Sequence, residues 1–198
     1  EDEQGNNLTF IAGQFDNPKW SAKYNKSLTA DERYIAGLHA DYSFNSWLKV
    51  DYRIGTNVST VNRREVTEIS STTASAEGLG RLILDNSRRQ EIESNLFFTI
   101  NPKINDDFSI NVILGQNTNQ RTYTRNASTG KRFITRGIYT LDNTSQQIFG
   151  IDQSLTNTYN FGDYYSRQRL IGVYGRAEFG YKNFAFIEVT GRNDWSST

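Results

Sequence analysis

Residues 34–55 read YIAGLHADYSFNSWLKVDYRIG, and this stretch decides the fold class. Apolar side chains recur at every second position over residues 34–44 and again over 48–54, and Asn45-Ser46 break the run. Because successive side chains of a strand point to opposite faces, a period of two gives each run one apolar and one polar face. Two such runs on either side of a short break predict an antiparallel β-hairpin.

Two further pairs of runs repeat this alternation later in the chain. The second pair is broken at Asn101-Pro102, where proline lacks the N–H that a strand ladder needs. The third pair is broken at Lys182-Asn183. The predicted strands of all three hairpins cover about residues 34–45, 47–57, 91–101, 107–116, 167–181 and 184–193.

The register of the third hairpin can be predicted from face parity, because directly paired residues point to the same face. Pairing Ala177 with Ile187 meets this condition and places Arg176 opposite Glu188. This register predicts a loop of about three residues, which is a common hairpin length.

The connections differ sharply in length. Short turns join the two strands of each pair, whereas residues of about 57–90 and 117–166 join one pair to the next, far more than the usual ~4–6 residues. In outer-membrane barrels, short periplasmic turns alternate with long extracellular loops. Strands of this length also match the ~9–11 residues needed to cross the hydrocarbon core at a tilt. The sequence therefore predicts an all-β fold of contiguous antiparallel transmembrane strands, with both long connections outside the cell.

Aromatic residues gather near the predicted short turns, as they do in the interfacial girdles of membrane barrels. The plain alternative is that aromatic residues favour strands of any kind. The residues concerned are Tyr42, Phe44, Trp47, Phe98, Phe108, Phe179, Tyr181, Phe184 and Phe186.

The composition excludes several classes of function. Lys and Arg (22) balance Asp and Glu (22), so the chain lacks the positive surplus that neutralises nucleic-acid phosphates. It has no cysteine, and therefore no disulfide framework, thiolate metal site or cysteine nucleophile. The mean hydropathy of −0.66 is compatible with a barrel, because a barrel strand places only every second side chain in lipid.

Six strands are too few to close a membrane barrel. The smallest single-chain barrels have about eight strands, and an open edge in lipid leaves backbone groups unpaired. Both ends of the chain also look cut from a longer protein. We therefore expect residues 1–198 to be part of one barrel domain, paired with the rest of the same barrel and surrounded by outer-membrane lipid.

An eight-residue motif ends the chain: Gly191, Arg192, Asn193, Asp194, Trp195, Ser196, Ser197 and Thr198. It resembles the signature of SusC/RagA-type TonB-dependent transporters of Bacteroidetes. Upstream, Asn17-Pro18-Lys19-Trp20 resembles the Asn-Pro-aromatic-Trp element of that family, departing from it at Lys19. A third match, a Trp-Leu hairpin followed by Arg-x-Gly, departs at Asn57, where the family often has Asp.

This resemblance implies a barrel of roughly 22 strands with an N-terminal plug, and the plug is absent from this sequence. It further implies TonB-dependent import of glycan or peptide fragments across the outer membrane, with a SusD-like lipoprotein as lid. Within the motif, Arg192 and Asp194 can form charge-assisted hydrogen bonds, and Trp195 can anchor the strand end. We interpret the motif as structural and not catalytic.

No arrangement of residues predicts an enzyme, a cofactor or a metal. His39, the only histidine, falls on a polar face beside Asp41, but no nucleophile elbow accompanies it. Glu91 and Glu93 share one strand face, and paired carboxylates can hydrolyse glycosides. On a barrel strand such residues are more often solvated, so a glycan-processing enzyme is the weakest of three hypotheses.

The connection from residue 117 to 166 is rich in aromatic residues. In an exposed loop these can stack on sugar rings or contact a partner, or they can pack the loop against its neighbours. The candidate ligand or partner contacts are Tyr123, Tyr139, Phe149, Tyr159, Phe161, Tyr164 and Tyr165. The alternative to an importer is a soluble all-β carbohydrate-binding or adhesin module, whose connections would be of more equal length.

Overall fold

The computed structural model describes residues 1–9, 11, 14–72, 78–151, 162–182 and 184–197. Strands dominate these residues. The elements are α1 (Pro18–Tyr24), β1 (Lys26–Ser43), β2 (Leu48–Ile69), β3 (Leu79–Ile100), β4 (Phe108–Phe133), the 3-10 helix η2 (Leu141–Asn143), β5 (Thr144–Phe149), β6 (Asp163–Tyr181) and β7 (Ala185–Ser197).

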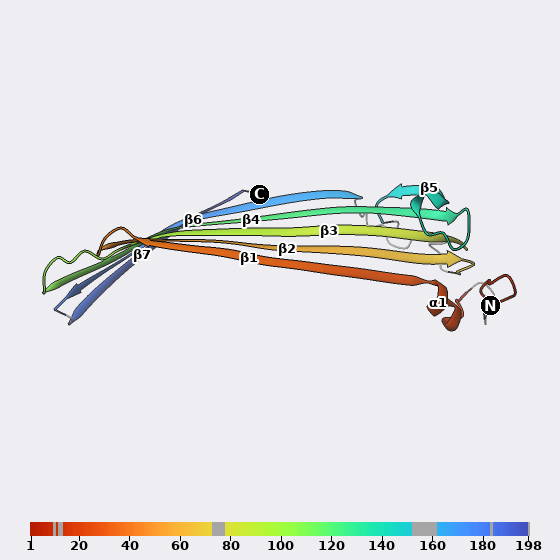
Figure 1. Ribbon diagram of the computed structural model, residues 1–198, viewed down its shortest axis with the longest axis horizontal. Coiled ribbons are helices and arrows are strands. Elements are labelled where there is room, and N and C mark those ends of the chain that lie inside the picture. The colour runs from red at the N-terminus through yellow and green to blue at the C-terminus, as the bar shows by residue number, and fades with distance from the viewer. Residues whose placement is uncertain (10, 12–13, 73–77, 152–161, 183, 198) are drawn as a thin grey trace. The chain divides into compact units, whose positions relative to one another are not determined.

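All seven strands belong to one antiparallel sheet. Its order is β1-β2-β3-β4-β6-β7, and β5 pairs with β4 beside this path (Figure 1). Neighbours in the sheet are thus neighbours in the sequence, apart from the short β5, as expected when hairpin turns join antiparallel strands. The predicted all-β fold of contiguous antiparallel strands is confirmed.

The strands are much longer than the sequence pattern indicated. Residues 57–69 and 79–90, which we assigned to a loop, extend β2 and β3, and residues 117–133 extend β4. The prediction that residues 57–90 and 117–166 form loops is therefore wrong over most of their length. These extensions are rich in polar residues, and in β3 both Leu82 and its neighbour Ile83 are buried, so they lack the alternation that identifies a half-buried strand.

The chain divides into two compact units. Unit 1 comprises Glu1–Glu32, Ser59–Arg88 and Tyr123–Tyr165, and unit 2 comprises Arg33–Val58, Arg89–Thr122 and Ser166–Thr198.

Unit 1 contains a small hydrophobic core built mainly from β2, β3 and β4. Val66, Leu82 and Phe133 form its centre, and four half-buried residues pack against it: Ile69, Leu84, Tyr139 and Leu141. Gly80 makes room for this core, because a Cβ there would lie 2.3 Å from Cδ2 of Phe133. A side chain at position 80 would also be strained by the φ of +85°.

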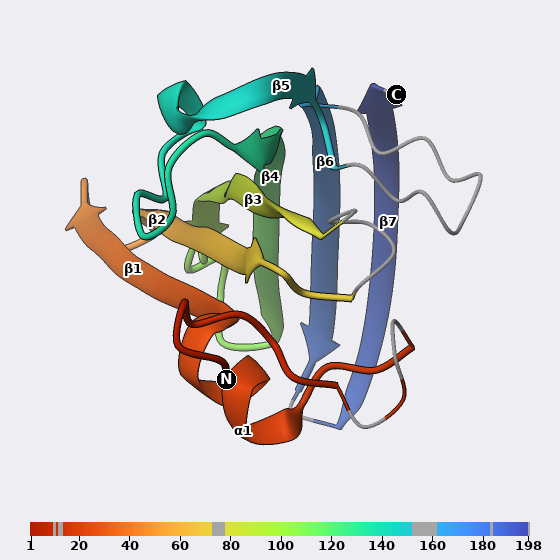
Figure 2. The same cartoon turned by 90° about the vertical axis from the view of Figure 1, so that its right-hand side faces the viewer.

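Unit 1 also contains α1, a helix that the strand pattern gave no reason to expect (Figure 2). Asn17 caps it, since its Oδ1 accepts a hydrogen bond from the Lys19 N–H at 3.0 Å, and Pro18 occupies the first turn. Trp20 is 3% exposed and donates from Nε1 to the Gly5 carbonyl at 3.0 Å. The helix thus fixes the N-terminal segment through one buried indole.

Unit 2 contains the three short connections. Asn45 forms the first, because its Oδ1 accepts from the N–H groups of Trp47 and Leu48 at 3.1 and 2.8 Å. Asn105 repeats this arrangement before β4, accepting from Asp107 and Phe108 at 3.0 and 2.8 Å. Short polar side chains that bond to the backbone two or three residues later are typical turn formers.

The third turn corrects the predicted register. Tyr181 pairs with Ala185, so three residues form the loop as expected, but Ala177 lies opposite Val189 and not Ile187. The prediction is wrong by two residues, a shift that keeps every side chain on its predicted face. Arg176 accordingly pairs with Thr190, yet its Nη2 still lies 2.8 Å from Oε2 of Glu188.

Within the described residues, no helix is both long and apolar enough to cross a membrane.

Candidate functional site

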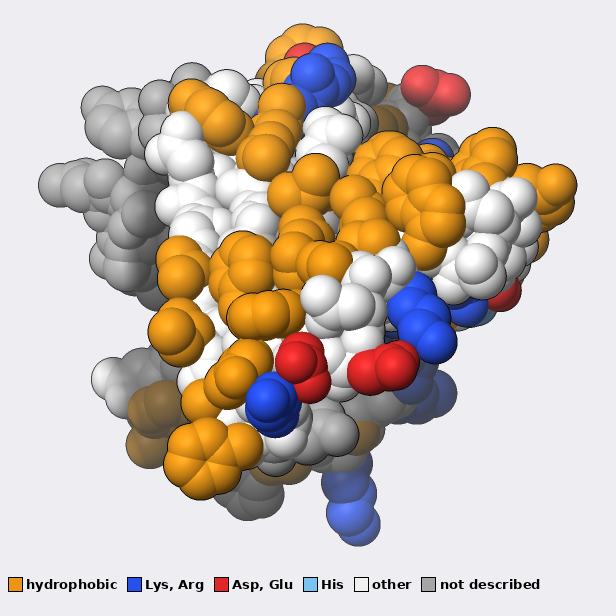
Figure 3. Space-filling model, turned by 90° about the vertical axis from the view of Figure 1, so that its left-hand side faces the viewer, with side chains coloured by type: hydrophobic (Ala, Val, Ile, Leu, Met, Phe, Trp, Pro, Cys, Tyr) orange, Lys and Arg blue, Asp and Glu red, His pale blue; other side chains and the backbone are white. Residues whose placement is uncertain are grey.

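The strands of unit 2 have an apolar face that is exposed to solvent. Its side chains occupy the alternate positions that the sequence marked as apolar, and Leu38, for example, is 77% exposed. Figure 3 shows hydrophobic side chains spread over the end of the structure where the short turns lie. The large exposed members of this face are Tyr34, Leu38, Tyr42, Phe44, Tyr52, Phe98, Phe108, Leu114, Val173, Phe179, Tyr181, Ile187, Val189 and Trp195.

The opposite face of unit 2 is polar, and its charged groups bond to one another. His39 Nε2 lies 2.6 Å from Asp51 Oδ2, and Lys49 Nζ lies 2.9 Å from Asp41 Oδ2. One apolar face and one hydrogen-bonded charged face are what a strand between lipid and a water-filled lumen requires.

Glu91 and Glu93 lie on this polar face but are engaged separately. Glu91 Oε1 accepts from Asn119 Nδ2 at 2.8 Å and from Arg121 Nε at 2.9 Å. Glu93 Oε1 accepts from Asn95 and from Asn117 at 3.3 and 3.2 Å. Each carboxylate therefore has its own donors, and β4 supplies at least one to each of them.

A row of rings and guanidinium groups crosses the polar face from β2 to β7. Cζ of Arg53 lies 5.5 Å from the ring centroid of Phe97, and Cζ of Arg192 lies 5.3 Å from that of Tyr174. The two rings are 6.2 Å apart and inclined at 67°, an edge-to-face arrangement. We call these four residues the aromatic row. Sequence alternation gave no sign of it, because it is built from residues far apart in the chain.

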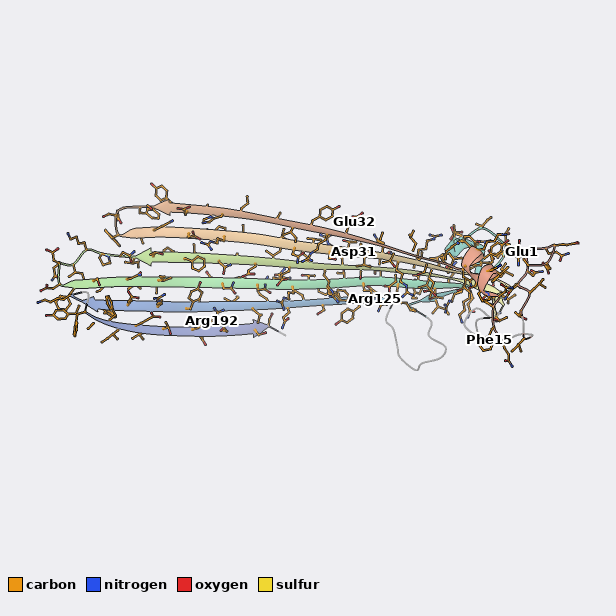
Figure 4. The ribbon with its side chains drawn as sticks, turned by 90° about the horizontal axis from the view of Figure 1, so that it is seen from below. Glu1, Phe15, Asp31, Glu32, Arg125 and Arg192 are labelled. Carbon is orange, nitrogen blue, oxygen red and sulfur yellow. The ribbon has the colours of Figure 1, made fainter. Side chains whose placement is uncertain are left out.

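Residues 191–197 of the C-terminal motif belong to β7, which continues to Ser197, so the predicted strand end at residue 193 is wrong. Arg192, labelled in Figure 4, donates from Nε to both carboxylate oxygens of Asp194 at 2.9 and 2.8 Å, which confirms the expected charge-assisted hydrogen bonds. Gly172 on β6 makes room for the pair, because a Cβ there would lie 2.5 Å from Arg192 Nη2. Trp195 lies opposite Ile171 and is 53% exposed. Thr198 lies outside the described residues.

The N-terminal motif is structural within unit 1. Besides α1, it adjoins Asp16, whose carboxylate accepts from the hydroxyl of Ser71 at 2.6 Å and from the hydroxyl and N–H of Thr72 at 2.8 and 2.6 Å. Asn7 Nδ2 and Asn25 Nδ2 add hydrogen bonds of 2.7 and 3.4 Å. Burial acts to raise the pKa of Asp16, but these hydrogen bonds outweigh it and hold that pKa below its ordinary value.

The aromatic residues predicted as loop contacts mostly lie in strands. Tyr123 on β4 contacts Tyr164 at the start of β6, with ring centroids 5.8 Å apart, and the next residue, Tyr165, is 63% exposed. Phe149 ends β5 and is 93% exposed. Tyr159 and Phe161 lie outside the described residues.

Tyr139 packs inward and does not face a ligand. Its ring lies 5.7 Å from that of Phe133, and its hydroxyl donates to Oε2 of Glu68, a carboxylate that is 1% exposed. Burial, followed by the neighbouring Glu68, raises the pKa of Tyr139 to about 12. This residue stabilises the core of unit 1.

Comparison with known proteins relates the chain to solved transporter structures. No protein-family model matches it, and neither does any curated protein. It superposes on a chain of the RagAB peptide transporter with a TM-score of 0.75 and 12% identity, over 96% of this chain and 20% of that one. The 'closed-closed' state of the RagAB peptide importer gives a TM-score of 0.74 and 12% identity, over 92% and 19% of the two chains. For the 'open-open' state the TM-score is 0.70, again at 12% identity, over 96% and 20%.

The chain thus has the fold of a segment of these transporters. It spans about a fifth of the length of the RagAB chains it matches. At this identity the likeness concerns the fold alone.

Proposed function

We propose that this chain forms part of the wall of a TonB-dependent outer-membrane β-barrel of the SusC/RagA type. One observation carries the proposal: within unit 2, alternate residues build an exposed apolar face and a charged, hydrogen-bonded face on the same strands. Lipid can cover the first face and water the second. The fold shared with the RagAB chains and the motif around Arg192 support the same reading.

In this proposal the barrel imports peptide or glycan fragments, works with a SusD-like lipoprotein, and draws energy from the TonB complex. The turns formed by Asn45 and Asn105 then face the periplasm. The polar side chains of unit 2, Glu91 and Glu93 among them, are wall residues and not catalysts.

The full-length protein that contains this chain provides the test. We expect it to fractionate with outer membranes, to need detergent for extraction, and to migrate differently on gels before and after boiling, as folded barrels do. Cells that carry it should take up fluorescent peptides or oligosaccharides only when TonB is present. A full-length protein that is soluble without detergent would instead establish the alternative, a soluble all-β binding module.

A further inference from the structure

Two arginines lie on the apolar side of unit 2, just beyond the last apolar residue of β6. On this strand, every second residue from Tyr181 to Ile171 belongs to the apolar face. The next two residues on the same side are Arg169 and Arg167, and both are exposed. Trp195 on β7 pairs with Ile171 and is 53% exposed, so an indole marks the place where the apolar face ends. Tryptophan is enriched at the boundary between hydrocarbon and headgroups.

One neutral side chain holds both guanidinium groups. Gln120 on β4 accepts at Oε1 from Nη2 of Arg167 at 2.8 Å, and from Nε and Nη2 of Arg169 at 3.2 and 2.7 Å. Within the described part of the chain, neither arginine forms an ion pair with a carboxylate; both bond to this amide instead. Two positive charges thus meet at one uncharged oxygen, and no described carboxylate offsets their repulsion.

Arginines on the polar face of unit 2 are paired differently. Arg121, which follows Gln120 in the sequence, donates to Oε1 of Glu91 at 2.9 Å. Arg192 donates to both carboxylate oxygens of Asp194. The polar face thus neutralises these guanidinium groups with carboxylates of the same chain, whereas the pair on the apolar side can accept an anion from outside.

The two arginines lie at the depth of lipid headgroups if unit 2 spans a membrane. From Tyr181, beside a short turn, to Ile171 the strand advances about 33 Å, at ~3.3 Å per residue. At the usual tilt of ~35–45° this crosses about 25 Å of the bilayer, which is the height of the apolar band on such barrels. Arg169 and Arg167 follow directly after it. Because the short turns face the periplasm in the proposed function, the adjacent headgroups belong to the outer leaflet.

We propose that Arg167 and Arg169 bind the phosphate group of a lipid in the outer leaflet, whose acyl chains lie on the apolar face beside Ile171 and Trp195. A guanidinium group presents paired N–H donors that match two phosphate oxygens, and arginine makes this match better than lysine. Gln120 is a positioning residue, because its Oε1 holds the two guanidinium groups at one point. The inference rests on the proposed function, since a membrane wall is what brings lipid to this face.

Native mass spectrometry of the purified full-length protein in a neutral detergent would measure binding of lipid A that carries two phosphates. Arg167→Gln and Arg169→Gln should each weaken binding about tenfold, the effect of losing one hydrogen bond to a charged group. Arg121→Gln is the matched control, because this arginine adjoins Gln120 but lies on the opposite face and bonds to Glu91. Its removal should leave lipid binding unchanged.

A further variant separates binding from structure. In Gln120→Glu, a carboxylate would accept hydrogen bonds from the same donors and neutralise both arginines. Lipid binding should therefore fall at least about tenfold, while the free energy of unfolding stays the same or increases. Damage to the fold cannot produce this combination.

Unchanged lipid binding in Gln120→Glu, or an equal loss in Arg121→Gln, would overturn the proposal. So would equal binding of lipid A from which a phosphatase has removed the phosphates. Displacement of the lipid by glucose 1-phosphate would also overturn it, because the ligand would then be a free sugar phosphate. A full-length protein that needs detergent yet binds no phosphorylated lipid would leave the proposed function standing, whereas a soluble full-length protein would defeat both.

Discussion

Arg125 on β4 forms a bidentate ion pair with Asp85 on β3. Nε and Nη2 donate to the two carboxylate oxygens at 2.8 and 2.9 Å, and the side chains are only 23% and 16% exposed. Hydrogen bonding to Asp85 raises the pKa of Arg125. Both residues belong to unit 1 and lie in the extensions of β3 and β4 that the sequence pattern did not predict. A bidentate pair at this depth is more than a surface ion pair, because solvent screens it less.

We expect this pair to couple β3 and β4 energetically. Asp85→Asn and Arg125→Gln should each lower the free energy of unfolding by about 1–3 kcal/mol, and the double variant should lose less than the sum. Urea unfolding in detergent would measure the free energy of unfolding of four full-length proteins: the unchanged protein, the two single variants and the double variant. Strict additivity of the two losses would show that the residues do not interact.

The Asp16 cluster should make the N-terminal segment sensitive to acid. Because folding lowers the pKa of Asp16, its contribution to stability is fully present above the ordinary value of 3.8 and is lost as the pH falls through the lower, folded value. Hydrogen exchange over residues 1–25, which include the buried Trp20, should therefore accelerate below pH 3.8.

Asp16→Asn provides the control for that measurement. This variant keeps the shape of the side chain but replaces one acceptor by a donor, so exchange should be faster at neutral pH and should depend less on acid. An acid response identical in the two proteins would assign the transition to other groups.

Tyr139 should contribute stability over a different pH range. Its pKa is raised to about 12 from 10.0, so the contribution is present below pH 10 and declines between pH 10 and 12, as the unfolded chain ionises first. Tyr139→Phe removes a donor from the buried Glu68 and should cost about 1–3 kcal/mol at neutral pH. The difference between the two proteins in urea unfolding should shrink above pH 10; a constant difference would contradict the raised pKa.

Sequence alternation identified the two faces of the unit 2 strands, because contact of one face with lipid or a core imposes a period of two. An error of two residues in strand register leaves every side chain on the same face. For that reason Arg176 and Glu188 met although the predicted register was displaced. Alternation could not show the strand extensions of unit 1, because adjacent residues such as Leu82 and Ile83 are both buried there and ion pairs such as Arg125 with Asp85 join the strands.

The sequence contains a signal for helix α1, but it contains none for the contacts that depend on the order of the strands. Asn17 followed by Pro18 is a helix-start signal, because Asn favours the N-cap and Pro the first helical turn, and this pair predicts the start of α1. The aromatic row depends on which strands become neighbours, so no local pattern contains it. The C-terminal motif was visible in the sequence, but the space that Gly172 leaves for Arg192 and Asp194 was not.

The two faces of unit 2 should differ in what they contact in the intact membrane. The chain has no cysteine of its own, so single cysteines can be introduced at Val112 and at its neighbour Asn111, whose side chains lie on opposite faces of β4. A spin label at Val112 should be relaxed by oxygen dissolved in lipid, and one at Asn111 by a water-soluble nickel complex. Val112→Arg should cost about 2–4 kcal/mol near the bilayer midplane, whereas Asn111→Arg should cost far less. Water contact at both positions would remove the basis for a membrane wall and favour the soluble β module, because a transmembrane strand must present its apolar face to lipid.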